Sequence, residues 1–240
     1  MSYRCSRARR EFESQLDQAV HELNPIYKYA IKSGGGGGAR LLAAYYVFAF
    51  AQLEVYIKSF VEDSINALSM SSPPFDKWPD LMMGYLLHRS DDLGAEYQKF
   101  GISEDEGAIL EKVAKTARKV AAWGRGGAVP TSVEAAAFLE KKKYPSPNNL
   151  PQLFRRLGVK QIWAVVSSTG KMNSELILRS LNDLRTSIAH EGRVLPGFSL
   201  GDFKNRLDQM RRFVAALDRG VSMHFCKGVM PRSMWNVAMA

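Results

Sequence analysis

The chain has 240 residues, of which 46% are hydrophobic and 24% are charged. These values are typical of a globular protein with a sizeable core, and they exclude a disordered chain. Its 33 basic and 24 acidic side chains leave a net charge of +9, which favours a polyanionic partner, chiefly nucleic acid. A basic soluble protein without such a partner is the alternative.

Two features of the chain bear on the compartment. The N-terminus is charged and lacks the apolar core of a secretory signal. Cys5 and Cys226 lie near opposite ends, with the spacing of neither a disulfide framework nor a zinc site. We therefore expect a cytoplasmic protein with no metal and no cofactor.

The first predicted element is a basic amphipathic helix within residues 1–33. It opens with four arginines between residues 4 and 10, and apolar residues follow at helical spacing. Pro25 and the five glycines Gly34–Gly38 limit how far this helix can extend. The glycines predict a flexible connector. A phosphate-binding P-loop is excluded because no Gly-Lys-Ser/Thr follows them.

A long apolar helix is predicted from Arg40 to about Met70. Apolar side chains cover much of its circumference, so it is expected at the centre of a bundle. The run Leu41–Val61 would also suit a membrane span. The polar residues Gln52, Glu54 and Lys58 within it favour a buried core helix and no membrane.

The middle of the chain predicts shorter helices. Prolines between residues 71 and 79 end the apolar helix. Capping boxes at Ser103-x-x-Glu106 and Thr131-x-x-Glu134 open two others. The resulting predicted helices are 81–88, 105–123 and one from 131 to the lysines at 141–143.

The C-terminal part predicts an extended linker at 144–151, short helices at 153–157 and 162–166, and then two longer helices. Asn173 caps the first, which ends near Gly192, and Ser199-x-x-Asp202 opens the last. No segment shows the alternation of a strand, so the predicted fold is all-α. It combines a long central apolar helix with a C-terminal helix–turn–helix pair.

Arg185 and His190 lie at the end of the first of these longer helices. Histidine titrates near neutral pH and can take or give a proton, and arginine offers a fixed cationic fork to phosphate oxygens. Arg219 and His224 have the same spacing, so the spacing alone proves nothing. The glycine stop after His190, where a ligand could approach, favours Arg185 and His190.

Several segments of the chain resemble HEPN domains, most closely the RiboL-PSP-HEPN branch. They are D-L-R-T-S-I-A-H-E-G at 183–192, Y-P-S-P-N-N-L-P-Q-L-F-R-R-L-G at 144–158 and F-K-N-R-L-D-Q-M-R-R-F-V-A-A-L-D at 203–218. The run A-F-A-Q-L-E-V-Y-I at 49–57 resembles the family's early helix with its glutamate. The resemblance is best over 144–226, weaker over 40–70 and absent over 75–143. On this basis we expect residues 1–240 to form one HEPN-like helical domain.

The resemblance implies a bundle that forms a homodimer through the motif helices. It also implies a metal-independent endoribonuclease, often a toxin or antiviral effector with a cognate antitoxin. Arg185 and His190 match the catalytic pair. Glu54 is a candidate for orienting Arg185. Further candidates are Asp183 and Glu191 as supporting carboxylates, and Arg179 and Arg193 as RNA contacts.

Thr186 is a departure from the family, because asparagine, aspartate or histidine usually follows the arginine. A catalytically inactive module that binds RNA or a nucleotide, or that regulates a partner toxin, is therefore the alternative function. A third hypothesis is a helical scaffold whose basic N-terminal arm docks on acidic partners.

Overall fold

The computed structural model describes residues 2–32, 37–71, 73, 77–85, 135–139, 145–191 and 198–240. Every regular element in these ranges is a helix, and none of these residues forms a strand. The prediction of an all-α fold with a long apolar helix is therefore confirmed. The predicted helix at 105–123 and the lysines at 141–143 lie outside the described residues.

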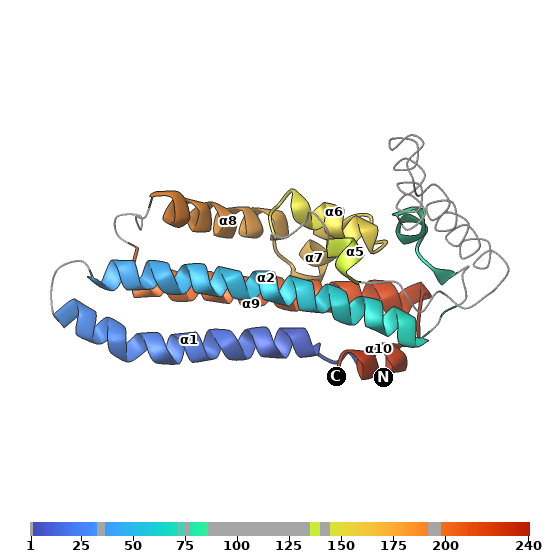
Figure 1. Ribbon diagram of the computed structural model, residues 1–240, viewed down its shortest axis with the longest axis horizontal. Helices are drawn as coiled ribbons and strands as arrows, with labels where there is room; N and C mark the ends of the chain where they lie inside the picture. The colour runs from blue at the N-terminus through green and yellow to red at the C-terminus, as the bar shows by residue number, and fades with distance from the viewer. Residues whose placement is uncertain are drawn as a thin grey trace, which may run out of the picture.

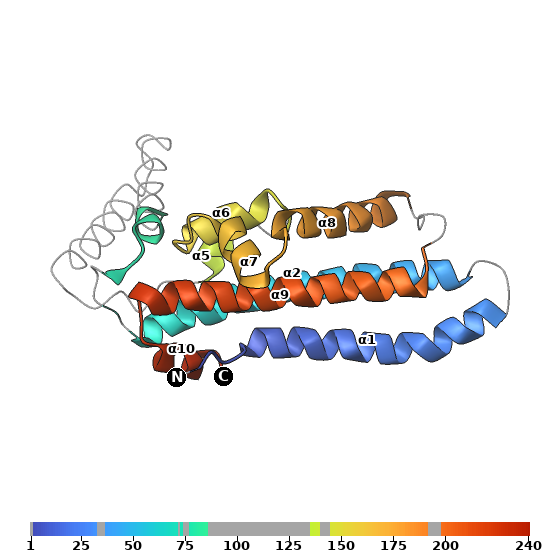
Figure 2. The same cartoon turned by 180° about the vertical axis from the view of Figure 1, so that it is seen from behind.

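The helices form three layers (Figures 1 and 2). The central layer consists of α2 (Gly37–Ser71) and α9 (Leu200–Gly228), which lie side by side. One side of it is covered by α1 (Arg7–Lys32) and α10 (Arg232–Ala238). The other side carries α5 (Ala135–Leu139), α6 (Asn149–Arg156), α7 (Ile162–Gly170) and α8 (Ser174–Glu191).

The core is built around α2, as its sequence predicts. Its buried side chains include Tyr46, Tyr56 and Phe60, which are at most 1% exposed. Length and composition alone would let this helix cross a membrane. In the structure it packs instead against α1, α8, α9 and α10. Because both flanking layers bury apolar area on it, α2 is the element to which the other helices are fixed.

The glycine connector is shorter than predicted, because α2 already begins at Gly37. Gly37 and Gly38 occupy its first turn, where the backbone N–H groups have no partner within the helix, so glycine costs little there. Gly38 is buried, and a Cβ at this position would lie 3.2 Å from the ring of Tyr27 in α1. The close approach of α1 and α2 therefore explains why this residue suits glycine.

Other helix boundaries also differ from the sequence-based ones. α1 continues through Pro25 to Lys32, and it is bent in its second half, which contains that proline (Figure 1). α6 begins at Asn149, inside the predicted linker, because Pro151 falls in the first turn and loses no hydrogen bond there. α7 is longer than predicted, the segment predicted at 81–88 is described as helix only over 80–85, and α10 was not predicted.

The basic N-terminal arm lies against its own chain. Tyr3 and Ser6 both donate hydrogen bonds to the carboxylate of Asp218, which is buried in α9. The backbone N–H of Arg7 donates to the carbonyl of Met239 at 2.8 Å. Arg10 donates to the backbone carbonyl of Ala240. These contacts join the two ends of the chain, so the arm is part of the fold.

Burial raises the pKa of Asp218, although the hydrogen bonds from Ser6 and Tyr3 act in the opposite direction. A carboxyl whose folded pKa exceeds its unfolded pKa binds more protons in the folded state. Its contribution to stability is therefore present below the unfolded pKa and is lost as pH rises through the folded pKa.

We predict that, relative to Asp218→Asn, the wild-type chain loses stability as pH rises from about 4. Denaturant unfolding of both proteins over a pH series measures this difference. A difference that is constant with pH would contradict the prediction.

Gly220 of α9 packs under α7. A Cβ at this position would lie 2.8 Å from Cγ1 of Val165 and 3.1 Å from Oγ1 of Thr169. At Gly228, near the end of the same helix, a Cβ would meet no atom of the described residues within 4 Å. We therefore expect Gly220→Ala to destabilise the protein by about 1–3 kcal/mol through overpacking.

Gly228→Ala is the matched control, and it should be neutral or slightly stabilising. Thermal unfolding of both variants measures the effect. Equal melting temperatures would show that α7 does not constrain α9 at Gly220.

Candidate functional site

The orientation of α8 is set by a buried apolar stripe. It consists of Leu178, Leu181, Leu184 and Ile188. The hydroxyl of Tyr46 in α2 donates a hydrogen bond to the carbonyl of Leu181 at 2.7 Å. This bond and the stripe fix which residues of α8 face outward.

Both helices of the α8–α9 pair begin with the predicted caps. The side chain of Asn173 accepts a hydrogen bond from the backbone N–H of Leu176 at 3.0 Å. At the start of α9, Ser199 and Asp202 form a reciprocal capping box. The sequence therefore located the starts of both helices correctly.

Arg185 and His190 both lie on α8, near its C-terminal end. Arg185 is half-buried, whereas His190 is exposed and in the last turn. The helix is continuous from Ser174 to Glu191, so a step of five residues separates the two side chains by about 140° around its axis. One copy of α8 thus presents them to different sides.

A groove of about 390 Å³ runs between α8 and α9. It is lined by Leu176, Arg179, Ser180, Asp183, Leu184 and Ser187 from α8 and by Arg206 from α9. Asp183, Ser187 and His190 follow one another at steps of four and three residues, which places them on one face of the helix. His190 therefore lies on the helix face that borders the groove.

Arg206 is held in place by two hydrogen bonds from one guanidinium nitrogen. Its Nη1 donates to Oγ of Ser180 at 2.7 Å and to Oε1 of Gln209 at 3.1 Å. Its other nitrogens, Nη2 and Nε, make no hydrogen bond to the part of the chain that the structure describes. A half-buried guanidinium that is held by one nitrogen and has donors left on the other two is well placed to bind an anion.

The remaining predicted residues have different settings. Arg179 forms an exposed ion pair with Glu175 at 3.0 Å and also lines the groove. Asp183 is exposed in the groove, and Thr186 is half-buried on α8. Glu191 is the last residue of α8, but its side chain lies outside the described residues, as does all of Arg193.

Glu54 has a partner on its own helix. Its carboxylate lies 2.8 Å from Nζ of Lys58, one turn further along α2. This ion pair is a sufficient structural reason for the glutamate. A role in orienting Arg185 stays a prediction.

The second Arg–His pair is placed quite differently. Arg219 is exposed on α9, and His224 is half-buried and lies beside the backbone of Gly158. Burial lowers the pKa of His224. Gly158 itself has a φ of 91° and lies against Pro79, in a turn that only glycine adopts readily. His224 therefore lies beside this turn and is not among the residues that line the groove between α8 and α9.

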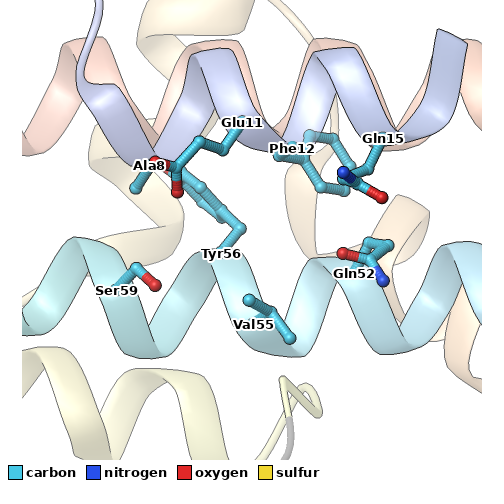
Figure 3. Close-up of a pocket in the computed structure, with 8 residues that line it drawn as sticks. All are labelled: Ala8, Glu11, Phe12, Gln15, Gln52, Val55, Tyr56 and Ser59. Carbon is cyan, nitrogen blue, oxygen red and sulfur yellow. The ribbon is translucent and has the colours of Figure 1, made fainter. Parts of the chain in front are cut away.

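A second cavity lies on the opposite side of the central layer, between α1 and α2 (Figure 3). Its volume is about 250 Å³. Gln15 of α1 and Gln52 of α2 lie opposite each other across it, and among the described residues that line it only Glu11 is charged. Without a cationic side chain in its lining, this cavity is a poor candidate for a phosphate group.

The sequence missed Arg206, Ser180 and Ser187 as groove residues. Helical spacing from Asp183 could have identified the two serines, because they lie on the same face of α8. It could not have identified Arg206, because the register between α8 and α9 depends on tertiary packing.

The described residues thus form an all-α bundle with a cationic groove and an exposed histidine beside it. A family model for RiboL-PSP-HEPN matches residues 14–222. The chain therefore belongs to the RiboL-PSP-HEPN family, and the resemblance seen in its motifs is confirmed. No curated protein and no solved structure matches the chain. Membership points to an RNase or a nucleotide-binding module.

The two histidines should separate function from stability. His224→Ala removes a half-buried ring that contacts Phe225, which we expect to cost about 1–3 kcal/mol of stability. His190→Ala removes an exposed side chain and should change stability by less than about 0.5 kcal/mol. Thermal unfolding of the two variants measures this contrast, and the opposite order would contradict the assigned roles.

Proposed function

We propose that this protein is a metal-independent endoribonuclease in which Arg185 and His190 act at one composite site formed by two copies of the chain. The observation that carries the proposal is the placement of His190, exposed in the last turn of α8 and on the face bordering a cationic groove. Membership in a family whose members commonly dimerise and bind RNA supports it.

The proposed chemistry uses the 2′-hydroxyl of the RNA as the nucleophile. Its oxygen attacks the adjacent phosphorus while a base takes its proton, and the bond to the 5′-oxygen breaks as that oxygen gains a proton from an acid. The products are a 2′,3′-cyclic phosphate and a 5′-hydroxyl. His190 transfers protons, and Arg185 binds the phosphate and stabilises the charge on its oxygens in the transition state.

A dimer would overcome a geometric difficulty of the single chain. Arg185 and His190 point about 140° apart on one continuous helix. A two-fold axis near the C-terminal end of α8 would place the Arg185 of one copy beside the His190 of the other. It would also supply a second imidazole, so that separate groups serve as base and acid.

A second candidate function is a catalytically inactive module that binds RNA or a nucleotide, or that neutralises a partner toxin. Thr186 favours it, because this residue stands where asparagine, aspartate or histidine usually follows the motif arginine. Binding of RNA without cleavage by the wild-type protein would support this second function. A toxin with a cognate antitoxin, or an antiviral effector, would be the biological setting of the nuclease.

The nuclease proposal is tested by incubating the purified protein with RNA, with and without a chelator. We predict cleavage in both conditions and a loss of about 100-fold or more in His190→Ala and in Arg185→Ala. Arg219→Ala is the matched control, because it alters the other Arg–His pair on an exposed site. Cleavage that disappears on chelation, or a His190→Ala variant as active as the wild type, would contradict the proposal.

Toxicity on expression gives an independent test. If the protein is a nuclease toxin, its expression should slow growth, and Arg185→Ala should relieve the effect. Equal toxicity of the wild type and this variant would favour another mechanism.

A further inference from the structure

We infer that the groove between α8 and α9 binds a nucleotide flanking the scissile phosphate of the RNA, with Arg206 as its phosphate contact. This inference rests on the proposed function, and it deepens it by assigning a substrate-binding subsite and a residue outside the Arg–His motif.

The groove is continuous with the proposed catalytic residue. Asp183 lines it, and His190 follows seven residues later on the same face of α8. An RNA strand whose phosphate lies at His190 can therefore extend along α8 into the groove without crossing the helix.

The position of Arg206 indicates which part of the strand it contacts. Its partner Ser180 precedes His190 by ten residues, which corresponds to about 15 Å along the helix axis. This distance is too long for Arg206 to share the scissile phosphate with His190. Arg206 would instead hold the phosphate of a flanking nucleotide.

The lining suits a nucleotide in size and chemistry. Its volume of about 390 Å³ is within the range of sites for small ligands. Leu176 is 59% exposed at the edge of the groove and offers apolar surface to a base or ribose. Asp183 would repel a phosphate but can accept a hydrogen bond from a base amino group or a ribose hydroxyl. The guanidinium of Arg206 supplies the charge, and its Nη2 and Nε make no hydrogen bond to the described residues.

The proposed dimer leaves accessible the part of this groove that lies toward the N-terminal end of α8. For two copies of His190 to meet, the two-fold axis must pass near the C-terminal end of α8. The groove residue Leu176 lies fourteen residues earlier, about 21 Å away along the axis. Each copy would then present its groove beside the composite site, and the two grooves would lead the RNA away in opposite directions.

The test is the binding of a short fluorescent single-stranded RNA to full-length protein, measured by anisotropy in a His190→Ala background that prevents cleavage. We expect Arg206→Ala to weaken binding about tenfold, the factor that corresponds to losing one hydrogen bond to a charged group. The slope of log K against log salt should also fall by about 0.7.

Arg206→Gln separates the loss of charge from a loss of structure, because glutamine can still donate a hydrogen bond to Ser180 but carries no charge. Arg212→Ala is the matched control, since Arg212 is exposed on the same helix and lies about 120° around it from Arg206. We expect its affinity to stay within about twofold of the parent, since it loses no groove contact.

An Arg206→Gln variant that binds as tightly as the parent would overturn the inference, and so would an equal loss in Arg212→Ala. Failure of this inference can be distinguished from failure of the nuclease proposal. If the wild type cleaves RNA and the Arg206 variants bind RNA as tightly as their parent, the groove is not the RNA subsite but the nuclease proposal stands. Weaker binding in Arg206→Gln without any cleavage by the wild type would keep the groove as an RNA site and reject the nuclease.

Discussion

The rotation of α8 about its own axis is the constraint on which the candidate site depends. The buried leucines of this helix and the hydrogen bond from Tyr46 to the carbonyl of Leu181 hold one face against α2 and α9. Because the helix has a fixed period, the outward face follows directly from the buried one. Exposure of His190 and the groove beside it are consequences of this packing. A change that rotated α8 by one residue position would turn His190 by about 100°, away from the helix face that borders the groove.

The central layer is the rigid support on which α8 packs. α2 is buried from both sides, and α7 is fixed to α9 through the close contact at Gly220. The N-terminal arm and the C-terminal residues are joined through Asp218 and Met239, on the side of the layer away from α8. The contacts between the chain ends and the candidate site are thus on opposite faces of the bundle. Substitutions in the groove can therefore change RNA binding without disturbing the contacts between the chain ends.

Much of the fold could be predicted because its signals are local. Periodic apolar residues predicted α1 and α2, and side-chain caps at Asn173 and Ser199 predicted the starts of α8 and α9. The glycine run was misassigned at its end, because the packing of Gly38 against Tyr27 is a tertiary contact that no local pattern encodes. α6 was predicted to start too late because Pro151 was treated as part of a linker, although proline is tolerated in a first turn. The same limit applies to the site, since helical spacing places His190 and Asp183 together but cannot bring Arg206 from α9.

The central claim, that two copies share one catalytic site, is tested most directly by subunit complementation. Arg185→Ala and His190→Ala chains with different affinity tags would be co-expressed, and the mixed dimer would be purified through both tags and assayed for RNA cleavage. If Arg185 of one copy acts with His190 of the other, the mixed dimer contains one intact pair but a single imidazole. It should therefore cleave RNA measurably, at a rate below that of the wild type, while each mutant homodimer stays inactive. A mixed dimer as inactive as the homodimers, beside an active wild type, would contradict a site shared between two copies.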